Sequence, residues 1–141
     1  MSLFPDTSTD FGRRVSRRLS ENKVIWLTTI SKDGTPQPNP VWFLWADAEI
    51  LVYNRADANR LGHLRERSRV SLNLDGDGKG GDIVVLAGSA EILQGQPGPH
   101  QNPAYVEKYG QDMIRISGSL EQFGAEYPIA TRIVIDRVRG H

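Results

Sequence analysis

The apolar residues of this chain first follow a helical period and then, from Val24 onward, the shorter spacing of strands. A stripe at every fourth position indicates the first helix: Phe11, Val15 and Leu19. Thr7 and Asp10 are spaced like a capping box, so we expect this helix to begin near Thr7 and to end near Asn22. Beyond it, β-branched and aromatic residues gather in short runs bounded by turn residues, which is the pattern of strands.

Six such runs are each of strand length, and they cover residues 24–30, 36–45, 50–53, 70–74, 82–93 and 131–138. Two tight turns separate neighbouring runs, Asp33-Gly34 and Asp47-Ala48, and Asp-Gly is a strong hairpin signal. Short helices are expected over residues 57–67, 104–109 and 120–127. The order of elements predicts a mainly β fold, a six-stranded antiparallel barrel that is closed or nearly closed.

Two features of these runs predict where the barrel is irregular. Gly88 in the fifth run is expected to form a bulge or bend. The second run contains three prolines that cannot donate to a sheet ladder, and it should therefore lie at an edge, a bulge or a cleft: Pro36, Pro38 and Pro40. Because a six-stranded barrel is too narrow to enclose a large ligand, we expect the ligand in a groove on the outside.

Length and composition describe one small globular domain. The 141 residues, 38% hydrophobic and 24% charged, favour a single core. The expected organisation is an N-terminal helix over 1–22, a barrel core over 23–93, a connection with short helices over 94–128, and a last strand over 129–141. A formal net charge of +0 gives no indication of binding to nucleic acid or to an anionic membrane. The lack of cysteine excludes disulfides, and the lack of a membrane-length apolar run or a signal-peptide core favours a cytoplasmic location.

The candidate binding site lies where the third run ends and a basic helix begins. The residues that meet there are Tyr53, Asn54 and Arg55 at the strand end, Asp57 and Asn59 as alternative helix caps, and Arg60 and Leu61 in the first helical turn. A helix N-terminus offers free N–H groups and a partial positive charge, which suit a phosphate group. Arg55 and Arg60 can add charge-assisted hydrogen bonds to the same anion. The competing interpretation is a surface helix with solvated arginines.

No other cluster indicates a catalytic acid, base, nucleophile or metal site. The three histidines have no metal-binding spacing, and a structural role is favoured for His63. Ser117-Gly118-Ser119 lacks the context of a hydrolase nucleophile, and the loop over 76–81 lacks the Lys-Ser/Thr ending of a phosphate loop. The lack of such a cluster fits a redox enzyme, in which a bound cofactor supplies the reactive centre.

The order of several short motifs resembles a known family. The stretch Gly34-Thr-Pro-Gln-Pro-Asn-Pro-Val-Trp-Phe43, after a strand and an Asp-Gly turn, is similar to the second strand of the pyridoxamine-phosphate-oxidase-like split barrels. The strand end over 51–53, the basic helix over 60–64 and the strand over 69–72 follow in that family's order. The resemblance covers roughly residues 20–93 and, more loosely, the last strand. Within the superfamily, the chain is most similar to actinobacterial-type flavin/deazaflavin oxidoreductases that use coenzyme F420.

This resemblance implies an FMN-binding split barrel that forms a homodimer, with two cofactors in grooves between the subunits. It places Arg60 at the family's phosphate-binding basic position, with Gly62 where relatives often carry a second basic residue. The other cofactor-binding residues that it implies are Gln37, Pro38 and Asn39 beside the tricyclic ring, Tyr53 and Asn54 along the phosphate or ribityl chain, and Arg55 and Leu61 near the phosphate. Arg55 is the candidate replacement for the missing basic residue. The resemblance implies no catalytic side chain.

The function that the resemblance implies is hydride transfer from reduced coenzyme F420 to a small electrophilic or unsaturated molecule. Three alternatives stay open: an FMN-dependent oxidoreductase or oxidase, a carrier that binds the cofactor without turnover, and a nucleic-acid-binding barrel. Neutral charge and 8% aromatic residues count against the last. Four arginines on the first helix are interpreted either as a solvated face or as a cationic surface that steers the acidic tail of F420: Arg13, Arg14, Arg17 and Arg18.

Overall fold

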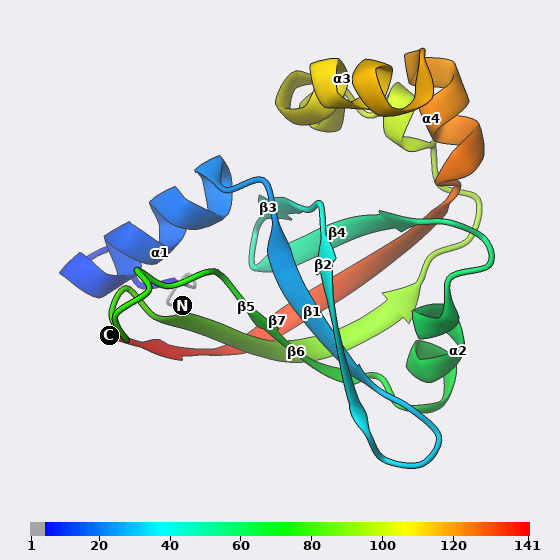
Figure 1. The fold of residues 1–141 in the computed structure, drawn as a ribbon. Coiled ribbons are helices and arrows are strands. Elements are labelled where there is room, and N and C mark those ends of the chain that lie inside the picture. Colours follow the sequence, from blue (N-terminus) through cyan, green and yellow to red (C-terminus); the bar gives the residue numbers. More distant parts are fainter. Residues whose placement is uncertain (1–4) are drawn as a thin grey trace.

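The protein folds as a curled antiparallel sheet with helices at its two ends and a helical pair standing to one side (Figure 1). A computed structural model describes residues 5–141. The helices are α1 (Asp10–Glu21), α2 (Asn59–Glu66), α3 (Pro103–Ser117) and α4 (Leu120–Glu126), with a short 3-10 helix η1 (Pro99–Gln101). The strands are β1 (Ile25–Ile30), β2 (Pro36–Val41), β3 (Leu44–Ala46), β4 (Glu49–Asn54), β5 (Arg69–Asn73), β6 (Val84–Ile92) and β7 (Ile129–Gly140). The predicted mainly β split barrel is confirmed, with seven strands in place of six.

The extra strand arises because the predicted strand over 36–45 is interrupted after Val41, where β2 ends, and resumes at Leu44, where β3 begins. In the strand order β2-β1-β5-β6-β7-β4-β3, the two edges are strands that follow one another in the chain. At the break, the Phe43 amide donates to Tyr109 Oη at 2.9 Å, and the Phe43 carbonyl accepts from Lys108 Nζ at 2.9 Å. Side chains of α3 therefore satisfy backbone groups that a continuous ladder would have paired.

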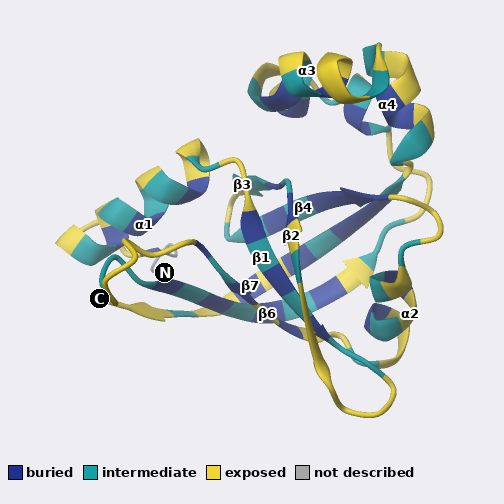
Figure 2. Cartoon of the chain, viewed as in Figure 1, coloured by how far each residue is buried: buried dark blue, intermediate teal, exposed yellow. Residues whose placement is uncertain are grey.

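The two predicted irregularities are confirmed. The proline-rich strand β2 is an edge strand, paired with β1 alone, and its first half is exposed (Figure 2). At Gly88 the register between β6 and β7 shifts, and a Cβ there would lie only 2.2 Å from the carbonyl oxygen of Val134. A residue without a side chain is therefore required at this bulge. Asp47 and Ala48 turn with φ angles of 54° and 63°, as the tight hairpin between β3 and β4 demands.

Two hydrophobic clusters hold the molecule together. The larger fills the barrel, and Val15 and Leu19 of α1 pack into it with no exposed surface. The smaller is aromatic and joins α3 and α4 to β4; its buried members are Tyr53, Tyr105, Tyr109, Met113, Phe123 and Ala130. The helical pair is therefore attached to the barrel by packing, although Figure 1 shows it standing to one side.

The helix ends differ from the sequence predictions in three places. Thr9, not Thr7, caps α1, because its Oγ1 accepts the Gly12 amide at 2.9 Å. Ala58 is the N-cap of α2, so neither Asp57 nor Asn59 caps it. The helix expected over 104–109 continues to Ser117 and ends at Gly118, whose φ of 93° favours glycine. No helix within residues 5–141 is long and apolar enough to cross a membrane.

Candidate functional site

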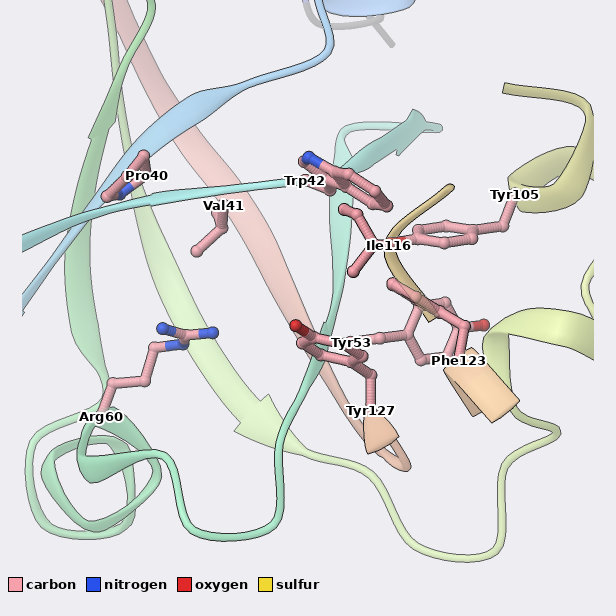
Figure 3. A pocket seen from close by; sticks show the side chains of 9 residues that line it. All are labelled: Pro40, Val41, Trp42, Tyr53, Arg60, Tyr105, Ile116, Phe123 and Tyr127. Carbon is pink, nitrogen blue, oxygen red and sulfur yellow. The ribbon is translucent and has the colours of Figure 1, made fainter. Parts of the chain in front are cut away.

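Two cavities of different character meet at the Arg60 side chain. The polar cavity, of about 460 Å³, lies between β2 and α2 and is lined by Gln37, Asn39, Ala58, Asn59, Arg60 and His63. The aromatic cavity, of about 210 Å³, is lined by Pro40, Val41, Trp42, Tyr53, Arg60, Tyr105, Ile116, Phe123 and Tyr127. Figure 3 shows Arg60 on one side of the aromatic cavity and the aromatic side chains on the other. The Arg60 guanidinium therefore borders both the polar and the aromatic cavity.

Most aromatic side chains that line the aromatic cavity pack against other aromatic rings. The Trp42 ring is nearly parallel to the Tyr109 ring, with centroids 4.7 Å apart, and it also stacks on Phe123 at 5.4 Å. Phe123 in turn stacks on Tyr127 at 4.4 Å. The rings hold one another in place, because offset stacking adds to the free energy of apolar burial, and they give the cavity an aromatic lining.

The hydroxyls of Tyr53 and Tyr105 in this cavity are neutral at physiological pH. Burial raises the pKa of Tyr53 and of Tyr105 above the usual value for a phenol. Tyr53 Oη accepts a hydrogen bond from Asn102 Nδ2 at 3.0 Å, which fixes the ring beside α3. Neither phenol can therefore act as a general base near neutral pH.

Arg60 is a half-buried cation without an acidic partner. Its Nε donates to Asn54 Oδ1 at 2.7 Å, and no carboxylate among residues 5–141 lies within ion-pair distance of its guanidinium. Burial lowers the pKa of Arg60 from its ordinary value, and the nearby Tyr127 opposes that shift. A guanidinium nevertheless stays charged at neutral pH. A partly desolvated, unpaired charge of this kind favours the binding of an anion.

The first turn of α2 adds donors to the same place. Ala58 has no side-chain oxygen to cap the helix, and the amides of Asn59 and Arg60 make no hydrogen bond within the described part of the chain. His63 is held at the edge of the polar cavity by a 2.9 Å contact between its Nδ1 and Thr29 Oγ1. The helix N-terminus and Arg60 together form a site with the chemistry of a phosphate pocket.

The predicted site residues fall into two groups. Those that line a cavity are Gln37, Asn39, Tyr53 and Arg60. Those that line neither are Pro38, which is exposed, Asn54 and Leu61, which are buried, and Arg55, which is exposed. Arg55 lies over the Tyr127 ring at 5.4 Å, with its Nε 3.9 Å from Asp57, so the cavities receive no second cation from it.

The sequence analysis missed the aromatic wall, because most of it comes from the segment interpreted as a connection. Tyr105 and Ile116 lie on α3, Phe123 lies on α4, and Tyr127 follows α4 directly. A signal was present: Tyr105, Tyr109 and Met113 recur at every fourth position and are all buried on one face of α3. Trp42, which follows β2 directly, also lines this cavity.

The cationic-surface interpretation of the α1 arginines loses its support, because all four are paired with carboxylates. Arg14 and Arg18 both form ion pairs with Asp82, Arg17 with Glu21, and Arg13 with Asp10. Helix α1 also lies at the opposite end of the barrel from α2 (Figure 1). These four arginines are therefore part of the framework of the N-terminal helix.

The pyridoxamine 5'-phosphate oxidase family model matches residues 11–138. The chain belongs to this family. The match extends beyond the stretch on which the sequence resemblance was based, and it includes α3, α4 and the last strand. The family resemblance proposed from short motifs is thereby confirmed.

Solved structures of similar proteins carry the same fold. A conserved hypothetical protein from Mycobacterium tuberculosis is 25% identical, with a TM-score of 0.69 over 90% of this chain and 81% of that one. A FAD-binding protein from Mesorhizobium loti is also 25% identical, with a TM-score of 0.64 over 87% and 88% of the two chains. An F420 reductase has a TM-score of 0.67 at 17% identity, over 88% and 94%. None of the curated proteins matches the chain.

Proposed function

We propose that this protein is an oxidoreductase that binds a phosphate-bearing cofactor of the flavin type, with its phosphate at Arg60. The observation that carries the proposal is the half-buried Arg60 guanidinium, which has no carboxylate partner among residues 5–141. A charge in such a place is destabilising unless an anion completes it. The uncapped N-terminus of α2 points additional donors at the same anion.

The two cavities fit the two halves of such a cofactor. The polar cavity, with Asn39, Asn59 and Arg60, suits a phosphate and a polyhydroxy chain. The aromatic cavity, with its stacked wall of Trp42 and Phe123, suits a planar ring and keeps water from one of its faces. When bound, the cofactor supplies the centre that accepts and donates hydride. The protein binds the phosphate, orients the ring and limits the access of water.

Coenzyme F420 is the proposed cofactor, and FMN is the second candidate. The fold shared with an F420 reductase and the motif order of the flavin/deazaflavin oxidoreductases support F420. The similarity to a FAD-binding protein from Mesorhizobium loti favours a flavin. Within residues 5–141, no group of three acidic, histidine or cysteine side chains is placed to hold a metal ion. The proposed reaction is hydride transfer to a small unsaturated or otherwise electrophilic molecule, with the accompanying proton taken from water; the hydride step itself needs no catalytic side chain.

Four ligands test the proposal by binding: F420, its deazaflavin core without the phosphodiester tail, FMN, and riboflavin. Titrations followed by ligand fluorescence should give F420 or FMN an affinity at least about tenfold higher than its phosphate-free counterpart. Equal affinity of both members in both pairs would contradict the phosphate site. Turnover is tested separately, by the loss of reduced F420 in the presence of small conjugated enones or quinones. Tight binding of F420 without turnover of any acceptor would indicate that the protein is a cofactor carrier and not an oxidoreductase.

We infer that the working form is a homodimer in which a second copy completes the cofactor groove. Ile116 lines the aromatic cavity and is still 49% exposed, and Ile114 on the same helix is equally exposed. Apolar side chains left open beside a ligand cavity are stabilised when another surface covers them. Sedimentation at micromolar concentration with cofactor present should give the mass of two chains. A mass of one chain would contradict the dimer and would leave the phosphate site untouched.

A further inference from the structure

Asn54 is a buried polar residue that the ligand cannot reach. It has no exposed surface, and it is one of three fully buried polar side chains described, with Thr29 and Thr131. It lines neither cavity, although the resemblance placed it along the cofactor. Buried amides persist only where their hydrogen bonds are satisfied. The hydrogen-bond partners of Asn54 therefore indicate the role of this side chain.

The hydrogen bonds of Asn54 fix the orientation of its amide. Its Nδ2 donates to the carbonyl oxygen of Ile129 at 2.9 Å, and it also lies 3.3 Å from the Val52 carbonyl oxygen and from Thr131 Oγ1. Thr131 Oγ1 donates in turn to the Val52 carbonyl at 3.3 Å. All these partners belong to the paired strands β4 and β7, which form a rigid support. Because Nδ2 of Asn54 faces these strands, its Oδ1 faces Arg60.

Asn54 Oδ1 accepts from Arg60 Nε at 2.7 Å, which directs the guanidinium without neutralising it. A carboxylate in this position would also hold Arg60, but it would cancel the charge that an anion needs. The two terminal nitrogens of Arg60 make no hydrogen bond within the described residues, and Arg60 borders both cavities. The neutral amide therefore leaves the arginine both positioned and electrostatically free.

We propose that Asn54 is a positioning residue that fixes Arg60 for the cofactor phosphate and keeps its charge unpaired. The inference rests on the proposed function, because it concerns the same phosphate. It assigns Asn54 an indirect role: the side chain contacts Arg60, and Arg60 contacts the ligand. Since Arg60 is already held before the ligand arrives, less side-chain entropy is lost on binding.

The readout of the test is the ratio of affinities within a pair of ligands. In one pair the affinity for FMN is divided by that for riboflavin, and in the other the affinity for F420 is divided by that for its core without the phosphodiester tail. A purely structural role of Asn54 would alter the melting temperature or weaken both members of a pair equally, so the ratio would not change. In Asn54→Ser, the shorter side chain keeps a hydroxyl for the strand carbonyls but cannot reach Arg60. The ratio should fall about two- to tenfold, the equivalent of leaving one long side chain to be ordered on binding.

Two further variants separate positioning from charge. Asn54→Asp should lower the ratio more than Asn54→Ser does, to the level of Arg60→Ala, because a carboxylate would pair with the guanidinium. Thr131→Val is the matched control, since it removes a neighbour of the Asn54 amide and leaves the contact with Arg60; its ratio should equal that of the wild type. Should Asn54→Asp fail to fold, Asn54→Ser in the Arg60→Ala background decides the question, and it should cause no further change in the ratio.

The outcomes distinguish this inference from the function on which it rests. An unchanged ratio in folded Asn54→Ser, together with a reduced ratio in Arg60→Ala, would overturn the positioning role and leave the phosphate site in place. An unchanged ratio in Arg60→Ala would contradict the phosphate site itself. A fall in the ratio for Thr131→Val as large as that for Asn54→Ser would also overturn the inference, because general damage to the β4–β7 support would then explain both.

Discussion

Helices α1 and α2 are both rich in arginine, but only α2 contributes a cation to a cavity. The four arginines of α1 each lie within 4 Å of a carboxylate; Arg18, for example, has its Nη1 3.2 Å from Asp82 Oδ2. Arg60 of α2 has a neutral amide as its partner instead. An arginine that is already paired contributes to the framework, whereas an unpaired, half-buried one is available to a ligand. The number of basic residues on a helix therefore says little about anion binding.

The largest effect should follow from removing the unpaired cation. Arg60→Ala is expected to weaken the binding of FMN or F420 about ten- to hundredfold, because a charge-assisted hydrogen bond contributes roughly 1.5–3 kcal/mol. Riboflavin and the tail-less deazaflavin should bind as they do to the wild type. Isothermal titration calorimetry gives the affinities, and Arg65→Ala, which changes an exposed arginine of the same helix, serves as the control. If both variants bind FMN and F420 like the wild type, the contrast between the two helices has no functional meaning.

On α1, the corresponding change should affect stability and not binding. The Arg18 side chain is only 12% exposed, and it donates to the carbonyl oxygens of Asp82 at 3.0 Å and Asp75 at 2.7 Å. Arg18→Ala should lower the free energy of unfolding by about 1–3 kcal/mol, since these two carbonyl oxygens lose a charged donor whose own side chain is mostly buried. Urea unfolding measures the change. A clear loss of FMN or F420 affinity in folded Arg18→Ala would show that α1 does contribute to the cofactor site.

A third kind of cation in the molecule is Lys108, whose Nζ donates to the Phe43 carbonyl and lies 4.0 Å from the Phe43 ring centroid. Burial, with a smaller contribution from Lys23, lowers the pKa of Lys108 to about 8. An unfolded lysine keeps its proton to about pH 10.4. Between these values the unfolded chain binds more protons than the folded one, so this lysine makes stability rise with pH in that window.

The pH effect is measured as the difference in unfolding free energy between the wild type and Lys108→Met. As the pH rises from 8 to 10, the wild type should gain unfolding free energy relative to Lys108→Met. Below pH 7 the difference should be constant, because Lys108 is protonated in both the folded and the unfolded chain. Chemical denaturation at a series of pH values provides the measurement. A difference that stays flat across the whole range would mean that Lys108 is solvated and ionises like an ordinary lysine.

The smallest effect is expected at Arg17. Its Nε lies 3.9 Å from Glu21 Oε2, and both side chains are mostly exposed, at 65% and 69%. Exposed pairs of this spacing contribute about 0.3–0.5 kcal/mol, and salt screens them. Arg17→Gln should therefore change the unfolding free energy by no more than about 0.5 kcal/mol and leave FMN and F420 binding unchanged. A large change in the salt dependence of F420 binding would restore the steering role that ion pairing argues against.

Short-range patterns were enough to find most elements and the arginine that borders both cavities. The prolines of β2 cannot donate to a ladder, so they predicted an edge, a bulge or a cleft, and the structure has the edge. Asp47-Ala48 and Gly88 predicted a turn and a bulge for equally local, steric reasons. The position of Arg60 after a strand end indicated a helix N-terminus with a cation. The strand count was wrong because the break at Phe43 depends on Tyr109, which is 66 residues away.

Which charges and which rings would meet was decided only by the tertiary structure. Arg18 and Asp82 are 64 residues apart, and the barrel brings them together, so no local pattern could show that Arg14 and Arg18 are paired with Asp82. The family resemblance placed Asn54 along the cofactor, whereas in the structure this side chain is buried at the end of the β4–β7 pair. The aromatic wall joins β2, β4, α3 and α4 because these apolar side chains are removed from water most fully when they stack together. Burial and ion pairing depend on every neighbour in space, whereas turns and strand edges depend on a few neighbours in the chain.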